Sequence, residues 1–141
     1  MLRRSWLLTA AAPILRGADS EQQVFEVFTD LASALSEGNA GGFLDHFHSS
    51  MPRYEEFRAA VTGLVTQAEV ASSIDFLRNE GNDAVRNVEV DWFLQIKQRH
   101  DTEAVTRRRE IVKCRVEKAG RKWKVFTLEP QALFAPVTVT K

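Results

Sequence analysis

The hydrophobic pattern of this 141-residue chain changes its period near residue 68, and this change limits the possible folds more than any other feature. Between residues 20 and 67, apolar residues recur at spacings of three and four, which is the repeat of an amphipathic helix. After Ala68 they alternate with polar residues, which is the repeat of a strand. Helices followed by strands predict an α+β domain, with the helices packed on one face of an antiparallel sheet.

Four β-rich runs follow Ala68, and turn-forming segments separate them. We expect strands over residues 71–78, 85–98, 105–117 and 122–128. Because the connections are short, neighbouring strands should form antiparallel hairpins in a meander. The central runs are much longer than the usual strand of about 5–6 residues. Long strands bend, often at bulges, so we expect a curved sheet that encloses a pocket.

Three helices are expected before the sheet. Ser20 followed by Gln23 is typical of a capping box, so we predict that the first helix begins at Ser20 and stops at Gly38. A short second helix is expected over residues 40–47. The third should begin near Pro52, because proline is favoured in the first helical turn.

The first 18 residues differ from the rest and are predicted to be a removable signal peptide. Arg3 and Arg4 precede an apolar run over residues 6–15, which is too short to span a membrane. The stretch 3–7, two arginines followed by serine, tryptophan and leucine, is similar to a bacterial twin-arginine signal. The general secretory route, a frayed first helix and a mistaken start codon are the alternatives. Export would place the domain, residues 19–136, in the periplasm or outside the cell, followed by a loose tail over 137–141.

Composition and motifs exclude several function classes. Lys plus Arg and Asp plus Glu are equal at 19 each, so no bulk attraction to nucleic acid or to anionic membranes is expected. A single cysteine, Cys114, cannot form an intrachain disulfide and is expected to be a small buried side chain. The sequence has no nucleophile elbow, phosphate-binding loop or dinucleotide fingerprint, so no cofactor is expected. His46 and His48 lack the spacing of a helical metal site, so we predict no metal.

Three segments of the chain carry a family resemblance. They are Val24–Leu35, Val88–Ile96 and Arg108–Pro130, within the order helix, short helix, helix and four-stranded meander. This layout resembles the nuclear transport factor 2-like superfamily, which includes polyketide cyclase (SnoaL)-like proteins and ketosteroid isomerases. The resemblance implies a cone whose helices and curved sheet enclose a cavity, often in a dimer that associates through the sheet. Here only residues 48–51 separate the second and third helices, where the enzymes usually carry a strand or hairpin, so no catalytic residues are carried over.

The expected cavity provides candidate site residues. The residues predicted to bind a small apolar ligand are Tyr54, Phe57, Trp92, Cys114 and Val125. If the last three face the cavity, strand alternation places Glu110 and Glu129 on the same side, where either could act as an acid or base. Tyr54 could then supply a hydroxyl, and Arg108 could neutralise one carboxylate. The alternative is an ion pair between Glu110 and Arg108 at the sheet edge.

Three functions therefore remain open. The first is an exported protein that binds a small apolar molecule without catalysis. The second is an isomerase or lyase that uses a pocket carboxylate. The third is an interaction module that forms a homodimer through the sheet face, with Phe93, Ile111 and Phe126 in the patch.

The twin-arginine interpretation makes a prediction about transport. Replacing the pair with lysines (Arg3→Lys with Arg4→Lys) keeps the positive charge but removes the arginine pair that the route requires. We expect the wild-type chain in the periplasmic fraction of a bacterial host and the double variant in the cytoplasm, as measured by fractionation and immunoblotting. Equal export of both chains would contradict the twin-arginine route, and cytoplasmic retention of both would contradict export.

Overall fold

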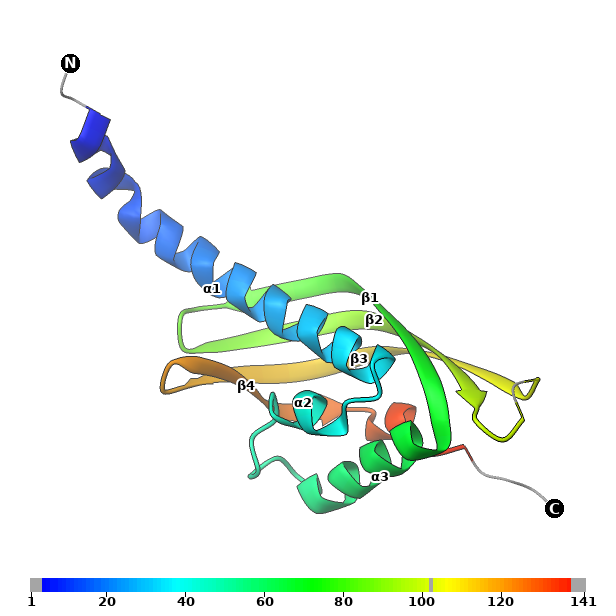
Figure 1. The fold of residues 1–141 in the computed structure, drawn as a ribbon. Helices are drawn as coiled ribbons and strands as arrows, with labels where there is room; N and C mark the ends of the chain where they lie inside the picture. The colour runs from blue at the N-terminus through cyan, green and yellow to red at the C-terminus, as the bar shows by residue number, and fades with distance from the viewer. Residues whose placement is uncertain (1–3, 102, 138–141) are drawn as a thin grey trace.

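The computed structural model describes residues 4–101 and 103–137, with side chains described from Asp19 onward. Three helices precede a four-stranded antiparallel sheet, and a short 3-10 helix follows it (Figure 1). The elements are α1 (Arg4–Ser36), α2 (Ala40–Leu44), α3 (Tyr54–Gln67), β1 (Ala68–Gly81), β2 (Val85–Gln98), β3 (Val105–Ala119), β4 (Lys122–Glu129) and η1 (Gln131–Phe134). This architecture confirms the predicted α+β class. Across the described residues, no helix has both the length and the apolar character needed to cross a membrane.

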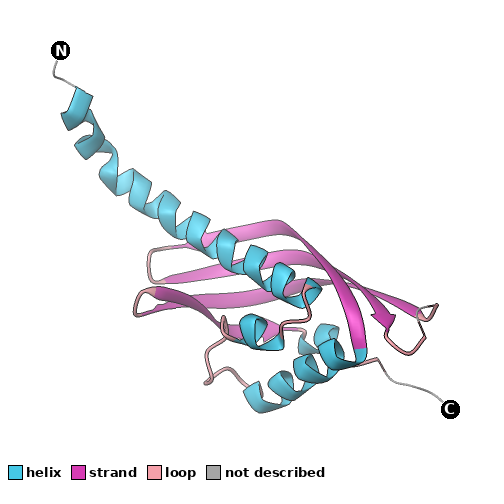
Figure 2. Ribbon diagram, viewed as in Figure 1, coloured by secondary structure: helices cyan, strands magenta, loops and turns pink. Residues whose placement is uncertain are grey.

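The strands of the sheet have the order β1-β2-β3-β4, and the helices lie on one face of the sheet (Figure 2). The prediction for β2 is confirmed at both ends. β1 is longer than expected by three residues at each end, because its pairing with β2 continues from Ala68, opposite Gln98, to Gly81, opposite Arg86. Pairing with a neighbouring strand thus extends β1 beyond the part that its own alternation predicts.

Aromatic side chains fill the space between the helices and the sheet. Phe28, Phe43, Phe57, Trp92 and Phe134 come from five different elements, and all are buried. The ring of Phe134 meets the indole of Trp92 edge-on, with centroids 4.9 Å apart, and lies 5.8 Å from the ring of Phe57. The inside of the cone is therefore a packed core.

The predicted start of the first helix at Ser20 is wrong, because α1 is continuous from Arg4. Ser20 Oγ donates instead to Asp83 Oδ1 at 2.7 Å, in the β1–β2 connection. Gln23 Oε1 accepts from Trp123 Nε1 at 2.9 Å, at the start of β4. Both residues of the supposed capping box therefore fasten α1 to the sheet, and the first half of α1 projects beyond it (Figure 1).

The predicted second helix, residues 40–47, is too long. α2 ends at Leu44, and the chain then turns towards β4. Phe47 forms an isolated bridge with Val125, in which Val125 N donates to His46 O at 2.8 Å and His48 N donates to Val125 O at 3.0 Å. Pairing with the sheet therefore replaces the last turn of the expected helix.

The aromatic core predicts the effect of one large deletion. Phe134→Ala removes a buried ring from the centre of the cluster and should lower the free energy of unfolding by about 3–5 kcal/mol. Denaturant titration followed by circular dichroism measures this value. The control is Arg107→Ala, an exposed position on β3, where we expect a change within about 0.5 kcal/mol. Equal stability of the two variants would contradict the packed cone.

Candidate ligand-binding groove

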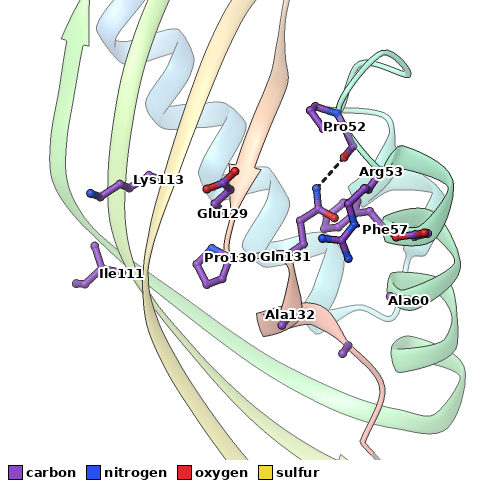
Figure 3. A pocket seen from close by; sticks show the side chains of 12 residues that line it. Pro52, Arg53, Phe57, Ala60, Ile111, Lys113, Glu129, Pro130, Gln131 and Ala132 are labelled. Carbon is purple, nitrogen blue, oxygen red and sulfur yellow. Dashed lines mark hydrogen bonds and ion pairs between the residues drawn. The ribbon is translucent and has the colours of Figure 1, made fainter.

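A groove of about 720 Å³ lies at the end of β4, between α3, η1 and β3 (Figure 3). Its lining combines apolar side chains from all three elements with a few charged ones. The lining residues are Pro52, Arg53, Glu56, Phe57, Ala60, Ile111, Lys113, Glu129, Pro130, Gln131, Ala132 and Ala135. This volume is within the range of about 300–1,000 Å³ that is typical of small-molecule sites.

Unequal strand lengths create the groove. β4 ends at Glu129, whose partner on β3 is Lys113, whereas β3 extends further, to Val105. Beyond Lys113, β3 therefore has no neighbouring strand on that side. The chain instead continues into η1, which lies against α3, and the groove opens between these elements.

Two sets of hydrogen bonds fix the C-terminal segment that forms one wall. Gln131 Nε2 donates to Pro52 O at 2.9 Å, which ties η1 to the turn before α3 (Figure 3). The side-chain amide of Gln67 makes two bonds to the backbone of Val137, at 2.8 and 2.9 Å. The prediction of a loose tail over 137–141 is therefore wrong at Val137. Residues 138–141 lie outside the described part of the chain.

Arg108 supports the same segment from the sheet. Its guanidinium donates to the backbone oxygens of Leu133, at 2.8 Å, and Ala135. Partial burial lowers the pKa of Arg108, although a guanidinium remains charged at any physiological pH. We expected Arg108 to neutralise a carboxylate in the cavity or to form an ion pair with Glu110. Its guanidinium binds backbone oxygens instead, so both expectations are wrong.

The groove has an apolar floor and a charged rim. Phe57 is buried at the floor, beside Ala60. On the rim, Arg53 Nε lies 2.9 Å from Glu56 Oε1, and both side chains are more than 70% exposed. Arg53 has φ 59°, the left-handed conformation, which costs an ordinary residue about 1–2 kcal/mol. Among the described residues other than glycine, it is the one with positive φ.

The structure separates the five predicted ligand contacts. Phe57 lines the groove, and Tyr54 is half-buried against the core. Trp92 and Val125 are completely buried, and Cys114 is buried. The indole N–H of Trp92 is already used, because it donates to Ser72 Oγ at 2.8 Å. The expected cone pocket is therefore filled, and the groove lies beside it.

The two candidate carboxylates lie on opposite faces of the sheet. Glu110 is opposite Trp92 in register and so lies on the same face of the sheet, which is the side predicted, but it is exposed. The prediction for Glu129 is wrong, because β4 contains a bulge: Arg115 pairs with Thr127 and Val116 pairs with Val125. The bulge shifts the inward alternation by one residue, so Glu129 faces away from the core. Of the described side chains, the buried polar ones belong to Ser20 and Arg86, and neither is a carboxylate.

The histidine segment caps the edge of β4. His48 stacks on Phe126 with ring centroids 4.2 Å apart, and its Nδ1 accepts from Ser50 N at 3.1 Å. His46 is half-buried, and this burial lowers its pKa. Both histidines therefore have structural neighbours at the β4 edge, and neither lines the groove.

The predicted dimer patch lies on the sheet face that turns away from the helices. Ile111 is 46% exposed, whereas Phe93 is half-buried. Between them, Arg109 pairs with Asp91 through three hydrogen bonds, at 2.7, 3.0 and 3.2 Å. Phe126 is half-buried on His48. The homodimer through this face stays a prediction.

The sequence did not reveal the groove residues Arg53 and Gln131. The available indication was the pair Leu133 and Phe134, two large apolar residues directly after the last strand. Such residues need burial, so the segment that carries them had to return to the body of the protein and form a wall there.

Comparisons with known proteins identify the fold. No family model and no curated protein matches the chain. Similar solved structures include a conserved protein from Planctomyces limnophilus (TM-score 0.71, 14% identity, covering 79% of this chain and 93% of that one). A hexachlorocyclohexane dehydrochlorinase matches with TM-score 0.65 at 12% identity (81% and 85%). A nuclear transport factor 2-like protein from Salmonella enterica matches with TM-score 0.64 at 12% identity (87% and 95%).

These matches confirm the predicted resemblance at the level of the fold. The chain has the nuclear transport factor 2-like fold: three helices on a four-stranded antiparallel sheet. Because the neighbours include enzymes and proteins of unknown function, the fold by itself does not assign an activity.

The position of Cys114 makes a prediction about its reactivity. Burial raises the pKa of this thiol, so it stays protonated at pH 8, where an unfolded cysteine is partly ionised and reactive. We expect no reaction with 5,5′-dithiobis(2-nitrobenzoic acid) in the native protein and one equivalent in denaturant, measured by absorbance. Rapid labelling of the native protein would show that this part of the core opens readily.

Proposed function

We propose that this chain binds a small, mainly apolar molecule in the groove between α3, η1 and β3. The observation that carries the proposal is a groove of about 720 Å³ with a buried aromatic floor and few polar groups at its rim. Small-molecule sites are usually concave and apolar, with a small number of polar groups that orient the ligand. The filled cone supports this position for the site over the cavity expected from the sequence.

The rim charges indicate the class of ligand. Arg53 and Lys113 contribute two positive charges, and Glu56 and Glu129 contribute two negative ones. Arg53 is already paired with Glu56, and Lys113 lies opposite Glu129 in register. Because these charges balance, the groove favours an apolar body with an uncharged polar end over a multiply charged ligand.

Binding is favoured over acid–base catalysis. An isomerase or lyase would need a carboxyl whose pKa is raised by apolar surroundings. Glu129 lines the groove, but it is exposed, and Glu110 is exposed on the other face. The described residues thus provide no secluded carboxylate for the reaction.

We also propose that the domain acts outside the cytoplasm, after removal of residues 1–18. The support is the pair Arg3 and Arg4 followed by a short apolar run. Ser20 and Val24 contact the rest of the domain, and both follow this segment. Cleavage near residue 18 would therefore leave these contacts intact.

Blocking the groove tests the binding proposal. Ala60→Trp places a large side chain into the groove, whereas Ala59→Trp adds the same side chain to the exposed surface of α3. The probe is N-phenyl-1-naphthylamine, an uncharged aromatic whose fluorescence rises in apolar surroundings. We expect saturable binding by the wild type and by Ala59→Trp, and an affinity at least about tenfold lower for Ala60→Trp.

A second blocking variant distinguishes a blocked groove from a misfolded protein. Ala132→Trp enters the groove from η1, where Ala132 is exposed. Circular dichroism verifies that each variant is folded. If both blocking variants bind the probe as tightly as the wild type does, the groove is not the site. If the wild type does not bind any member of a panel of uncharged apolar probes, the proposal fails.

A further inference from the structure

We propose that the free edge of β1 pairs with the same edge of a second copy, so that two sheets join into one across a two-fold axis. This surface is separate from the groove and from the sheet face of the predicted dimer. Four observations support it: the covering of the other edges, the direction of the backbone groups, exposed apolar side chains at this edge, and a charge pattern that suits self-pairing.

Parts of the other edges of the sheet are covered. Along β4, Val125 exchanges backbone hydrogen bonds with the segment His46–His48. Where β3 extends beyond β4, the C-terminal segment lies beside it and Arg108 holds that segment in place. On its outer side β1 has no partner strand among the described residues. Proteins usually protect such edges, because the unpaired backbone groups are a template for another strand.

The backbone groups at this edge alternate in a defined way. Arg99 N donates to Gln67 O at 3.1 Å, which continues the register between β1 and β2. Alternate residues of a strand direct their backbone groups to the same side, so odd-numbered residues up to Asp75 bond to β2. The backbone groups of Ser72 and Ile74 therefore point to the free edge.

Apolar side chains flank the same edge. Phe25 on α1 is 45% exposed and Leu77 on β1 is 56% exposed, and they are two of the three large hydrophobic residues that are exposed in the described chain. The ring of Phe25 contacts that of Phe76, with centroids 5.0 Å apart. Phe25, Phe76 and Ile74 line a shallow groove of about 360 Å³ between α1 and β1. A second copy at this edge would bury these side chains.

The charges of β1 are compatible with pairing to itself. With the two-fold axis at Ile74, that residue meets its own copy, Ser72 meets Phe76, and Ser73 meets Asp75, so no like charges are opposed. An axis at Asp75 would oppose two carboxylates, which is unfavourable in a cross-strand pair. A closed two-fold arrangement also uses up both free edges and so prevents further addition of strands.

A charge placed at the edge tests the proposal. The double variant Phe25→Lys with Leu77→Lys changes two exposed residues, and each change acts twice in a two-fold interface. We expect the full chain to be a dimer and the variant's dissociation constant to be higher by at least about tenfold, as measured by sedimentation equilibrium. The control is Phe93→Glu on the sheet face, which should leave an edge dimer intact.

Hydrogen exchange gives a second measurement that needs no substitution. In a monomer, the amides of Ser72 and Ile74 should exchange quickly, whereas those of Ser73 and Asp75 are protected by β2. In an edge dimer, all four are protected, and the protection of the first two depends on concentration. A monomer at all concentrations would overturn the proposal. So would a dimer that Phe93→Glu breaks, or one in which Ser72 and Ile74 exchange quickly.

Discussion

The contact between Phe134 and Trp92 is the interaction on which the arrangement of this protein depends. Trp92 lies on β2, where it is paired on both sides, with Ile74 of β1 and Glu110 of β3, and Phe134 reaches it from the last element of the chain. To bring that ring inside, the C-terminal segment must cross the open side of the cone, where Arg108 and Gln67 hold it. The protein's own side chains thus fill the space inside the curved sheet, and the groove lies outside this core.

The shortness of β4 determines where that groove lies. Its bulge uses one residue without extending the pairing with β3, and the strand ends at Glu129 while β3 continues. The same bulge brings Leu128 inward and Glu129 outward, which places a carboxylate on the rim of the groove instead of in the core. One local irregularity therefore decides both the position of the site and its lack of a secluded acid.

Periodicity was enough to predict the order of the elements, because alternation and the helical repeat follow directly from which face is buried. It was not enough to predict long-range hydrogen bonds. Ser20 and Gln23 fit a capping box locally, but their side chains bond to Asp83 and Trp123, far away in the sequence. The facing of Glu129 failed for a similar reason, since alternation assumes a regular strand and the bulge at Phe126 breaks it. The groove depends on long-range hydrogen bonds and on the bulge in β4, so it could not be inferred from the sequence.

The groove and the β1 edge are independent features, because they lie on opposite sides of the core. The groove is bordered by α3, η1 and β3, whereas the free edge is bordered by α1 and β1. Between them lies the closely packed cluster of buried side chains around Trp92. The residues that line the groove and those that line the hollow beside the edge do not overlap. The proposed binding and the proposed association therefore rest on separate surfaces, which is what a scaffold with many functions requires.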